Sequence, residues 1–449
     1  MCSLADIKAA KAQRVYADDQ TTANTLFGSI TNPTRATDVD TSNFSTLSVT
    51  LGALGLLSAT QNLRFTQAGS LPLPTSPMMV RFGSSSAVLG LVNGIILQRT
   101  NGGINNPVGP SYTAGTLLDL LNLANAGSSP EVVLPIPGVA GAANDGVYLQ
   151  VNTVLGVALS AKLYYAFFIK APVVSDQTIC SGVSTTLTIT NPQVGYTYRW
   201  YDSLTGGTQL QGSASTTFAV SGLSATKVYY VEACESSSAT AYRSGRTAVT
   251  VTVRPLPAAP GFAGVPAICS GGTTTLNVTG SDTGAVYRWY TDPSGGASFF
   301  TGSSYTTPGL ADTTRYYVDA YRASSGCVSS VRTLVQVNVR PLPGITFTSP
   351  FYLCQSRTQA QLNYTAAINS PSIYSIAWSA GALSAGFTNV PNTAFPASPF
   401  NITIPGNAAP QSYAGTLTLT GANTCTRSYL FTLVIQPTPH PSPPSTSFQ

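Results

Sequence analysis

Few residues in this chain of 449 residues could carry out catalysis. Its single histidine, His440, lies in a Pro/Ser-rich stretch, which removes Ser-His-Asp and Cys-His arrangements and histidine-bound metals. A glycoside hydrolase needs only two carboxyl groups about 5 to 10 Å apart, but the 16 acidic residues are scattered along the sequence. We therefore expect no enzyme, and keep a hydrolase with an acidic pair in residues 13–170 as a third alternative.

The seven cysteines offer a different chemistry, because six of them fall in pairs and leave Cys2 over. One pair per segment predicts three disulfides, namely Cys180–Cys234, Cys269–Cys327 and Cys354–Cys425. Such a framework indicates an oxidising, extracytoplasmic compartment, and six buried thiols are the alternative. The second cysteine lies 12 residues before an Arg-Thr pair in the first segment (246 − 234) and 5 in the second (332 − 327), so whether Cys180 and Cys234 pair stays open.

Five oxygen-bearing residues near the N-terminus could bind calcium, a hard cation that takes roughly six to eight oxygen ligands. They are Asp18, Asp19, Asp38, Asp40 and Asn43. The alternative, which we favour, is that Asp38-x-Asp40-x-x-Asn43 forms a turn whose side-chain oxygens accept hydrogen bonds from the local backbone. Apart from this calcium hypothesis we expect no cofactor.

The composition limits the partners of the chain. Hydrophobic residues make up 43% and charged residues only 8%, against about 25% charged in an average soluble domain. The net charge of +5 is spread out without a basic cluster, which argues against nucleic acid. The richest apolar run, residues 154–168, is interrupted by Lys162, so we expect no membrane-spanning helix.

Two segments of the chain repeat each other. Cys180-Ser-Gly returns as Cys269-Ser-Gly, and the offset of 269 − 180 = 89 residues suits a small β-sandwich domain. The other matches are Tyr-Arg-Trp-Tyr at 198–201 and 287–290, Tyr-Tyr-Val at 229–231 and 316–318, and Arg-Pro-Leu-Pro at 254–257 and 340–343. A third, fainter copy contains Trp378, at 378 − 289 = 89 residues from its counterpart. Each copy is predicted to bury core aromatics, namely Trp200, Trp289, Trp378, Tyr230 and Tyr317.

The first 170 residues differ from the repeats. Short runs of β-branched and aromatic residues between Gly, Pro, Asn and Ser predict strands, and residues 116–124 predict one short helix. The predicted protein is all-β, with a jelly-roll-like sandwich before three tandem sandwiches. The segments are 1–12 (leader remnant), 13–170 (first sandwich), 171–254, 255–340 and 341–437 (repeats, the last diverged) and 438–449 (Pro/Ser-rich tail).

The repeat motifs Cys-x-Gly-x-x-x-Thr-Leu, Tyr-x-Trp-Tyr, Gly-Gly and Tyr-Tyr-Val resemble the Ig-like modules of large secreted and cell-surface proteins of Bacteroidetes, many of them associated with gliding, adhesion or type IX secretion. The resemblance covers residues 174–343 well and 344–437 loosely. It implies a secreted protein at the cell surface and an immunoglobulin-type sandwich. It also implies O-glycosylation at Asp-Ser/Thr-apolar motifs, here Ser203 and Thr313.

Together these features predict a non-enzymatic surface adhesin, or a fibre subunit that assembles through β-strand contacts. The partners would be further copies of the chain or other surface proteins, with residues 13–30 as a strand-donating arm. The alternative is a carbohydrate-binding protein with its glycan site in residues 13–170 and the repeats as a spacer. Exposed aromatics such as Tyr201, Tyr290 and Phe299-Phe300 could also stack on sugar rings.

Overall fold

The computed structural model describes residues 14–38, 40–50, 57–84, 94–113, 116–117, 131–152, 158–235, 242–280 and 282–438. They belong to two compact units, residues 1–255 and 256–449. Among the described residues no helix is long and apolar enough to cross a membrane. The predicted leader with Cys2, most of the predicted helix at 116–124, and the tail from residue 439 with His440 lie outside the described residues.

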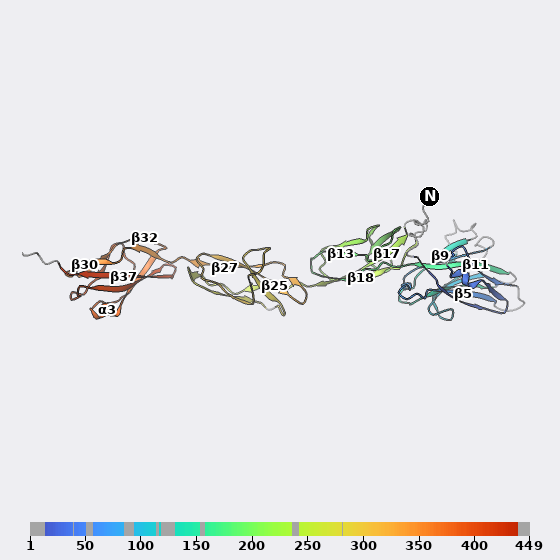
Figure 1. The fold of residues 1–449 in the computed structure, drawn as a ribbon, viewed down its shortest axis with the longest axis horizontal. Coiled ribbons are helices and arrows are strands. Elements are labelled where there is room, and N and C mark those ends of the chain that lie inside the picture. Colours follow the sequence, from blue (N-terminus) through green and yellow to red (C-terminus); the bar gives the residue numbers. More distant parts are fainter. Residues whose placement is uncertain are drawn as a thin grey trace, which may run out of the picture. The chain divides into compact units, whose positions relative to one another are not determined.

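The first unit begins with a head domain, residues 14–170, built from two antiparallel sheets (Figure 1). One sheet has the order β3-β4-β11-β6-β9 with β1 beside β11, and the other has the order β2-β5-β10-β7-β8. Both sheets contribute residues to one core, so the head domain is a β-sandwich. The strands are β1 (Arg14–Tyr16), β2 (Asp19–Asn24), β3 (Gly28–Thr31), β4 (Ser45–Val49), β5 (Ser58–Arg64), β6 (Met78–Gly83), β7 (Ile95–Thr100), β8 (Pro107–Tyr112), β9 (Glu131–Ile136), β10 (Gly146–Asn152) and β11 (Leu159–Ile169).

The two head sheets enclose one core because their apolar residues alternate. In β10, Val147, Leu149 and Val151 are almost completely buried, while Tyr148 and Gln150 between them are partly exposed. This period of two is what a strand with one inward face requires. The same alternation places Leu47 of β4 in that core.

The N-terminal strands are part of the head domain's own sheets. Arg14 of β1 pairs with Ile169 of β11, and Asp19 of β2 pairs with Arg64 of β5. Val15 packs on the head core. Over residues 14–30 the predicted strand-donating arm is therefore not a free segment, because β1, β2 and β3 pair within the head sheets.

The head domain continues without a gap into sandwich 1, residues 171–255. Phe167 and Ile169, at the end of β11, belong to the same buried cluster as Trp200 of sandwich 1. Arg14 donates two hydrogen bonds to the Glu235 carboxylate, at 2.8 and 2.7 Å, and its guanidinium lies 4.7 Å from the centre of the Phe167 ring. A shared core and a buried ion pair therefore join these two domains.

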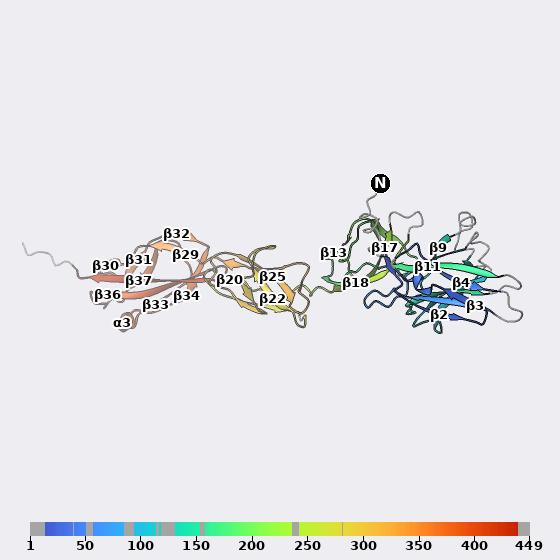
Figure 2. The ribbon, with the colours of Figure 1, turned by 45° about the vertical axis from the view of Figure 1, so that its right-hand side comes forward.

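Sandwich 1 and sandwich 3 (residues 342–438) have the same main sheet. Its order is β12-β18-β17-β14-β15 in sandwich 1 and β30-β37-β36-β33-β34 in sandwich 3. Figure 2 shows β30 and β37 side by side, and their pairing is parallel, like that of β12 and β18. The strands are β12 (Gln177–Cys180), β14 (Tyr196–Tyr201), β15 (Gln209–Ser213), β17 (Lys227–Glu235), β18 (Thr247–Arg254), β30 (Phe351–Cys354), β33 (Pro371–Trp378), β34 (Val390–Ala394), β36 (Ser412–Gly421) and β37 (Thr426–Gln436).

Smaller sheets close each of these two sandwiches. They pair β13 with β16 in sandwich 1, and β31 with β35 and β29 with β32 in sandwich 3, where a short helix, α3, follows β33. Their bounds are β13 (Thr185–Thr188), β16 (Thr217–Val220), β29 (Gly344–Phe347), β31 (Gln359–Leu362), β32 (Tyr364–Ile368), β35 (Phe400–Thr403) and α3 (Ala380–Ser384).

Sandwich 2, residues 256–341, has a similar arrangement of strands, and several of its strands are shorter. Its strand β20 pairs in parallel with β28, the last strand of the domain. Its main sheet has the order β23-β22-β25-β26 with β27 also beside β25, and β19-β21-β24 lie opposite. The strands are β19 (Gly261–Phe262), β20 (Ile268–Cys269), β21 (Thr275–Thr279), β22 (Val286–Tyr290), β23 (Phe300–Thr301), β24 (Ser304–Thr306), β25 (Thr314–Arg322), β26 (Cys327–Val328), β27 (Thr333–Val337) and β28 (Val339–Arg340).

Each sandwich has a core tryptophan. Trp200 and Trp289 are fully buried, and Trp378 is 6% exposed. The inward tyrosines, however, are Tyr229 and Tyr316, each 5% exposed. Their neighbours Tyr230 and Tyr317, predicted as core residues, are half-buried on the other face of the strand. The buried Val231 and Val318, two residues after Tyr229 and Tyr316, fix this inward register.

The Arg14–Glu235 pair gives a first testable prediction. Glu235→Gln leaves the half-buried Arg14 charge without its carboxylate, so we expect a loss of about 3 kcal/mol in the free energy of local opening at this junction. Hydrogen–deuterium exchange of the backbone amides of β1 and β17 in the full chain measures this free energy. The control is Lys227→Gln, which changes an exposed charge on the same strand and should cost less than about 0.5 kcal/mol. Unchanged exchange in the Glu235→Gln variant would contradict a stabilising role for the pair.

Candidate functional site

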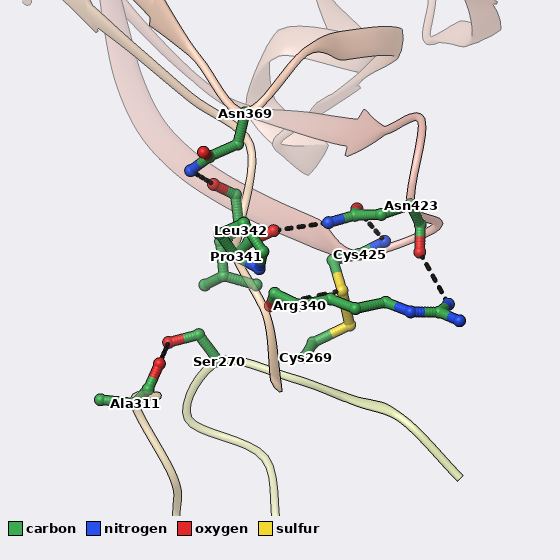
Figure 3. The surroundings of a disulfide bond; sticks show 9 residues. All are labelled: Cys269, Ser270, Ala311, Arg340, Pro341, Leu342, Asn369, Asn423 and Cys425. Atoms are coloured by element: carbon green, nitrogen blue, oxygen red, sulfur yellow. Dashed lines mark hydrogen bonds between the residues drawn. A yellow bond between two sulfur atoms is a disulfide. The ribbon is translucent and has the colours of Figure 1, made fainter. Parts of the chain in front are cut away.

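A disulfide between Cys269 and Cys425 joins sandwich 2 to sandwich 3 (Figure 3). Their Cα atoms lie 5.6 Å apart, although 156 residues separate them in sequence. This bond corrects two predicted pairs, Cys269–Cys327 and Cys354–Cys425. Cys180 and Cys327 are also disulfide-bonded, whereas Cys234 is a buried thiol, so the predicted Cys180–Cys234 bond is not formed.

The geometry of the last strand explains why the predicted pairs fail. Cys354 pairs in register with Gln436, at the end of β37, while Cys425 immediately precedes the first residue of that strand. The 11 residues of β37 span roughly 35 Å. A disulfide needs Cα atoms within about 7 Å, so cysteines at opposite ends of a sandwich cannot bond to each other.

We call the cysteine beside the end of the last strand the exit cysteine, and the one near its start the front cysteine. The exit cysteines are Cys180, Cys269 and Cys354, and the front cysteines are Cys234, Cys327 and Cys425. The observed bond therefore links the exit cysteine of sandwich 2 to the front cysteine of sandwich 3.

Hydrogen bonds hold the linker beside this disulfide. Asn369 donates to the carbonyl of Leu342 at 2.7 Å, and Asn423 donates to the carbonyl of Pro341 at 2.8 Å. Arg340 in turn donates to the backbone oxygen of Asn423 at 3.1 Å. Figure 3 shows these bonds on both sides of the linker, so the Pro-Leu-Pro segment is fixed by side chains from two loops of sandwich 3.

A cavity of about 710 Å³ lies at the same junction. Sandwich 2 contributes Ser270, Asp312 and Thr313 to its wall, and sandwich 3 contributes Ile368 and Arg427. The Ser270 hydroxyl already donates to the carbonyl of Ala311 at 3.0 Å. The wall offers polar contacts but no nucleophile paired with a base.

A second arrangement recurs on the outer face of the main sheet. In sandwich 1 the Arg246 guanidinium lies 3.3 Å from the centre of the Tyr201 ring and 3.3 Å from Glu232. Arg246 also donates to the carbonyls of Ser203 and Gly206, at 2.6 and 2.7 Å. One arginine therefore ties the Gly-Gly turn to the sheet.

Sandwich 2 repeats this arrangement. Arg332 lies 3.3 Å from the centre of the Tyr290 ring and donates to the carbonyl of Asp292 at 2.9 Å. The Asp319 carboxylate stands where Glu232 stands, and Arg288 donates to it at 2.8 and 2.9 Å. The hydrogen bond with Asp319 raises the pKa of the Arg288 guanidinium, and burial raises the pKa of Tyr290.

These contacts correct the expectation that Tyr201 and Tyr290 are exposed and could stack on sugar rings. Tyr201 and Tyr290 are about 6% and 5% exposed under their arginines, so neither ring is open for stacking on a sugar. Burial raises the pKa of Tyr201, and the Glu232 carboxylate adds to the rise. The arginines were not singled out from the sequence, although the Arg-Thr pair recurs in both repeats. Phe299 and Phe300 remain exposed, at 45% and 36%, and the centre of each ring lies 5.2 Å from that of Tyr305.

The predicted calcium ligands do not converge. Asp38 accepts hydrogen bonds from the Asp40 backbone and the Asn43 side chain, and Asp40 accepts from the Ser42 backbone, which is the turn we favoured. Asp18 accepts from Thr66, and Asp19 pairs with Arg64. Within the described ranges no group of three or more His, Cys, Asp or Glu could hold a metal ion.

The two predicted glycosylation residues lie in loops. The Ser203 hydroxyl donates to the carbonyl of Thr205 at 3.0 Å, in the turn that Arg246 holds. The Thr313 side chain is exposed, and its hydroxyl accepts from the Val339 amide at 3.1 Å. Glycosylation at either residue stays a prediction.

Residues 170–255 and 257–341 match the family model described as Ig-like domain CHU_C associated. Sandwiches 1 and 2 are therefore tandem Ig-like domains of that family. No curated protein matches the chain.

Solved structures with similar folds consist of Ig and fibronectin modules. The fibronectin(III)-like modules of Clostridium thermocellum CbhA are 17% identical over 37% of this chain and 91% of theirs, with a TM-score of 0.23. The ectodomain of mouse nectin-like molecule 4 is 16% identical over 61% of this chain and all of its own, with a TM-score of 0.27. The insect immune protein hemolin is 10% identical over 69% and 86%, with a TM-score of 0.24. Similarity at this level carries no information about function.

Arg332, the arginine that stacks on Tyr290, gives a second prediction. Arg332→Lys keeps the charge but cannot both stack on Tyr290 and reach Asp292, so we expect sandwich 2 to lose about 1 to 2 kcal/mol in free energy of unfolding. Faster hydrogen exchange of residues 290–301 in the full chain would show it. Arg315→Lys is the control, because Arg315 is an exposed arginine of the same domain that donates to Gln336, and it should change exchange little. Equal exchange in both variants would mean that Arg332 does not stabilise the Gly-Gly turn.

Proposed function

We propose that this chain is a non-enzymatic extracellular structural protein, an adhesin or a surface-fibre subunit, whose Ig-like domains act as a stiffened spacer. The observation that carries the proposal is the Cys269–Cys425 disulfide between consecutive sandwiches. Disulfides persist in oxidising compartments outside the cytoplasm, which supports an extracellular location. A bond between domains, rather than within one, suits a protein in which the movement of one domain relative to the next must be restricted.

The disulfide changes the path of a pulling force through the second unit. Tension applied at residues 259 and 438 passes from Cys269 directly to Cys425 and then along β37. Residues 270–424, between the two cysteines, form a closed loop that does not carry the load. Unfolding of that loop cannot lengthen the chain while the bond is intact.

The buried carboxylates support a structural role. Glu232, Glu235 and Asp319 are each at most 7% exposed, and each faces an arginine. Their oxygens already accept hydrogen bonds from guanidinium groups, and breaking such a buried pair is costly. These carboxylates are therefore engaged in holding the domains together and are not presented to a substrate.

A second candidate function is glycan binding by the head domain. A cavity of about 580 Å³ is lined by Tyr16, Asp18, Asp38, Gln67 and Lys170, which combine an aromatic edge with polar groups. Such a combination is typical of sites for polar ligands. A glycan array with the full chain tests it: binding lost on Asp38→Ala would support a site here, and an array without binding would remove this candidate.

The spacer is tested by pulling single molecules of the full chain with handles at positions 259 and 438, both exposed. The oxidised wild-type chain should extend by roughly 80 Å between the handles, because about two dozen residues outside the loop can stretch. Cys269→Ser/Cys425→Ser should add roughly 500 Å, the contour of the 156-residue loop.

Two controls accompany the pulling experiment. Cys354→Ser changes an exposed cysteine outside the bond and should behave as wild type. Reducing agent added to the wild-type chain should reproduce the longer extension of the double variant. A long extension in the oxidised wild-type chain would overturn the spacer proposal.

A further inference from the structure

The three exit cysteines occupy the same position in three sandwiches. Cys180, Cys269 and Cys354 pair in parallel register with Arg254, Arg340 and Gln436, the last residues of the strands that lead out of each domain. The residue after each cysteine donates its amide to the carbonyl of that same partner, at 2.9 Å in all three sandwiches. A proline follows each partner, in Pro255, Pro341 and Pro437.

The same backbone hydrogen bond closes the turn after each exit cysteine. The carbonyl of Cys180 accepts from the amide of the residue three positions later, at 3.0 Å, and those of Cys269 and Cys354 accept in the same way, at 2.8 and 3.1 Å. The strand register and the backbone hydrogen bonds around the three cysteines are therefore the same.

The three cysteines differ in bonding. Cys269 is bonded to the front cysteine of the following sandwich, and Cys180 is disulfide-bonded as well. Cys354 is an exposed thiol. From this equivalence we propose that Cys354 is a covalent attachment site for the front cysteine of a further Ig-like module, on the same polypeptide or another, in a bond like Cys269–Cys425.

The front cysteine in sandwich 3 shows what the partner must provide. Cys425 is fully buried and lies just before the last strand, and the Asn423 side chain accepts from its amide at 3.1 Å. Asn423 also holds the linker. In a second full copy of this chain Cys425 is already bonded to Cys269, so the partner must be a further module whose front cysteine is not yet bonded.

The bond forms by thiol–disulfide exchange. The two thiols lose two electrons and two protons, and a disulfide oxidant such as oxidised glutathione takes them up and leaves as two thiols. No other co-reactant is needed.

The test extends the full chain with one more module of known sequence. Residues 1–436 are followed by a second copy of residues 341–438, so that Gln436 precedes Pro341 as Arg340 does at the natural junction. The added copy carries Ala409→Ser, an exposed change that distinguishes its Cys425 peptide by mass. The protein is oxidised in a glutathione buffer, its remaining thiols are alkylated, and its peptides are identified by mass spectrometry. We expect a peptide pair that joins Cys354 to Cys425 of the added copy, and alkylation of Cys354 in the added copy.

Controls separate this proposal from misfolding and from the spacer function. The bond between Cys269 and the original Cys425 must be recovered in every variant, which shows that the second unit is folded and tests the spacer independently. Cys354→Ser in the first copy should leave the added Cys425 alkylated. Alkylation of both partners, a mixed disulfide of Cys354 with glutathione alone, or a bond between Cys354 residues of two molecules would each overturn the proposal.

Discussion

The distance between the two cysteines of a sandwich determines which disulfides this chain can form. A disulfide spans only about 7 Å between Cα atoms, while β37 alone extends over roughly 35 Å. With one cysteine near each end of that strand, bonding within a sandwich is excluded. Parallel pairing of β20 with β28, and of β30 with β37, then places the exit cysteine beside the residue from which the chain continues.

Much of the fold could be predicted from the sequence, because strand patterns and repeated motifs depend on local residues. The tandem sandwiches and their buried tryptophans follow from the spacing of Cys, Trp and Tyr-Tyr. Which tyrosine of each pair points inward depends on register, and a shift of one residue reverses the faces. The tyrosine prediction was therefore off by one position, although the strand itself was placed correctly.

The disulfides could not be predicted in the same way, because cysteine counts and spacings do not determine connectivity. One pair per repeat suggested bonds within domains, and only the positions of the cysteines along β20 and β37 show otherwise. The two arginines that hold the Gly-Gly turns were not predicted, for a related reason. Arg246 and Arg332 each precede the last long strand of their domain, and their contact with a tyrosine and a Gly-Gly turn depends on the sheet that brings these segments together.

Each unit joins two neighbouring domains, but by different physical means. In the first unit the head domain and sandwich 1 share a buried apolar cluster. The Arg14–Glu235 ion pair adds a directional contact between the same two domains. In the second unit Trp289 and Trp378 belong to separate clusters, and the junction depends on the disulfide and on hydrogen bonds to the linker. A shared core requires two large complementary surfaces, whereas a disulfide requires one well-placed residue on each side. The second solution can be repeated along a row of small domains without changing their cores, which is why we expect it wherever this exit turn recurs.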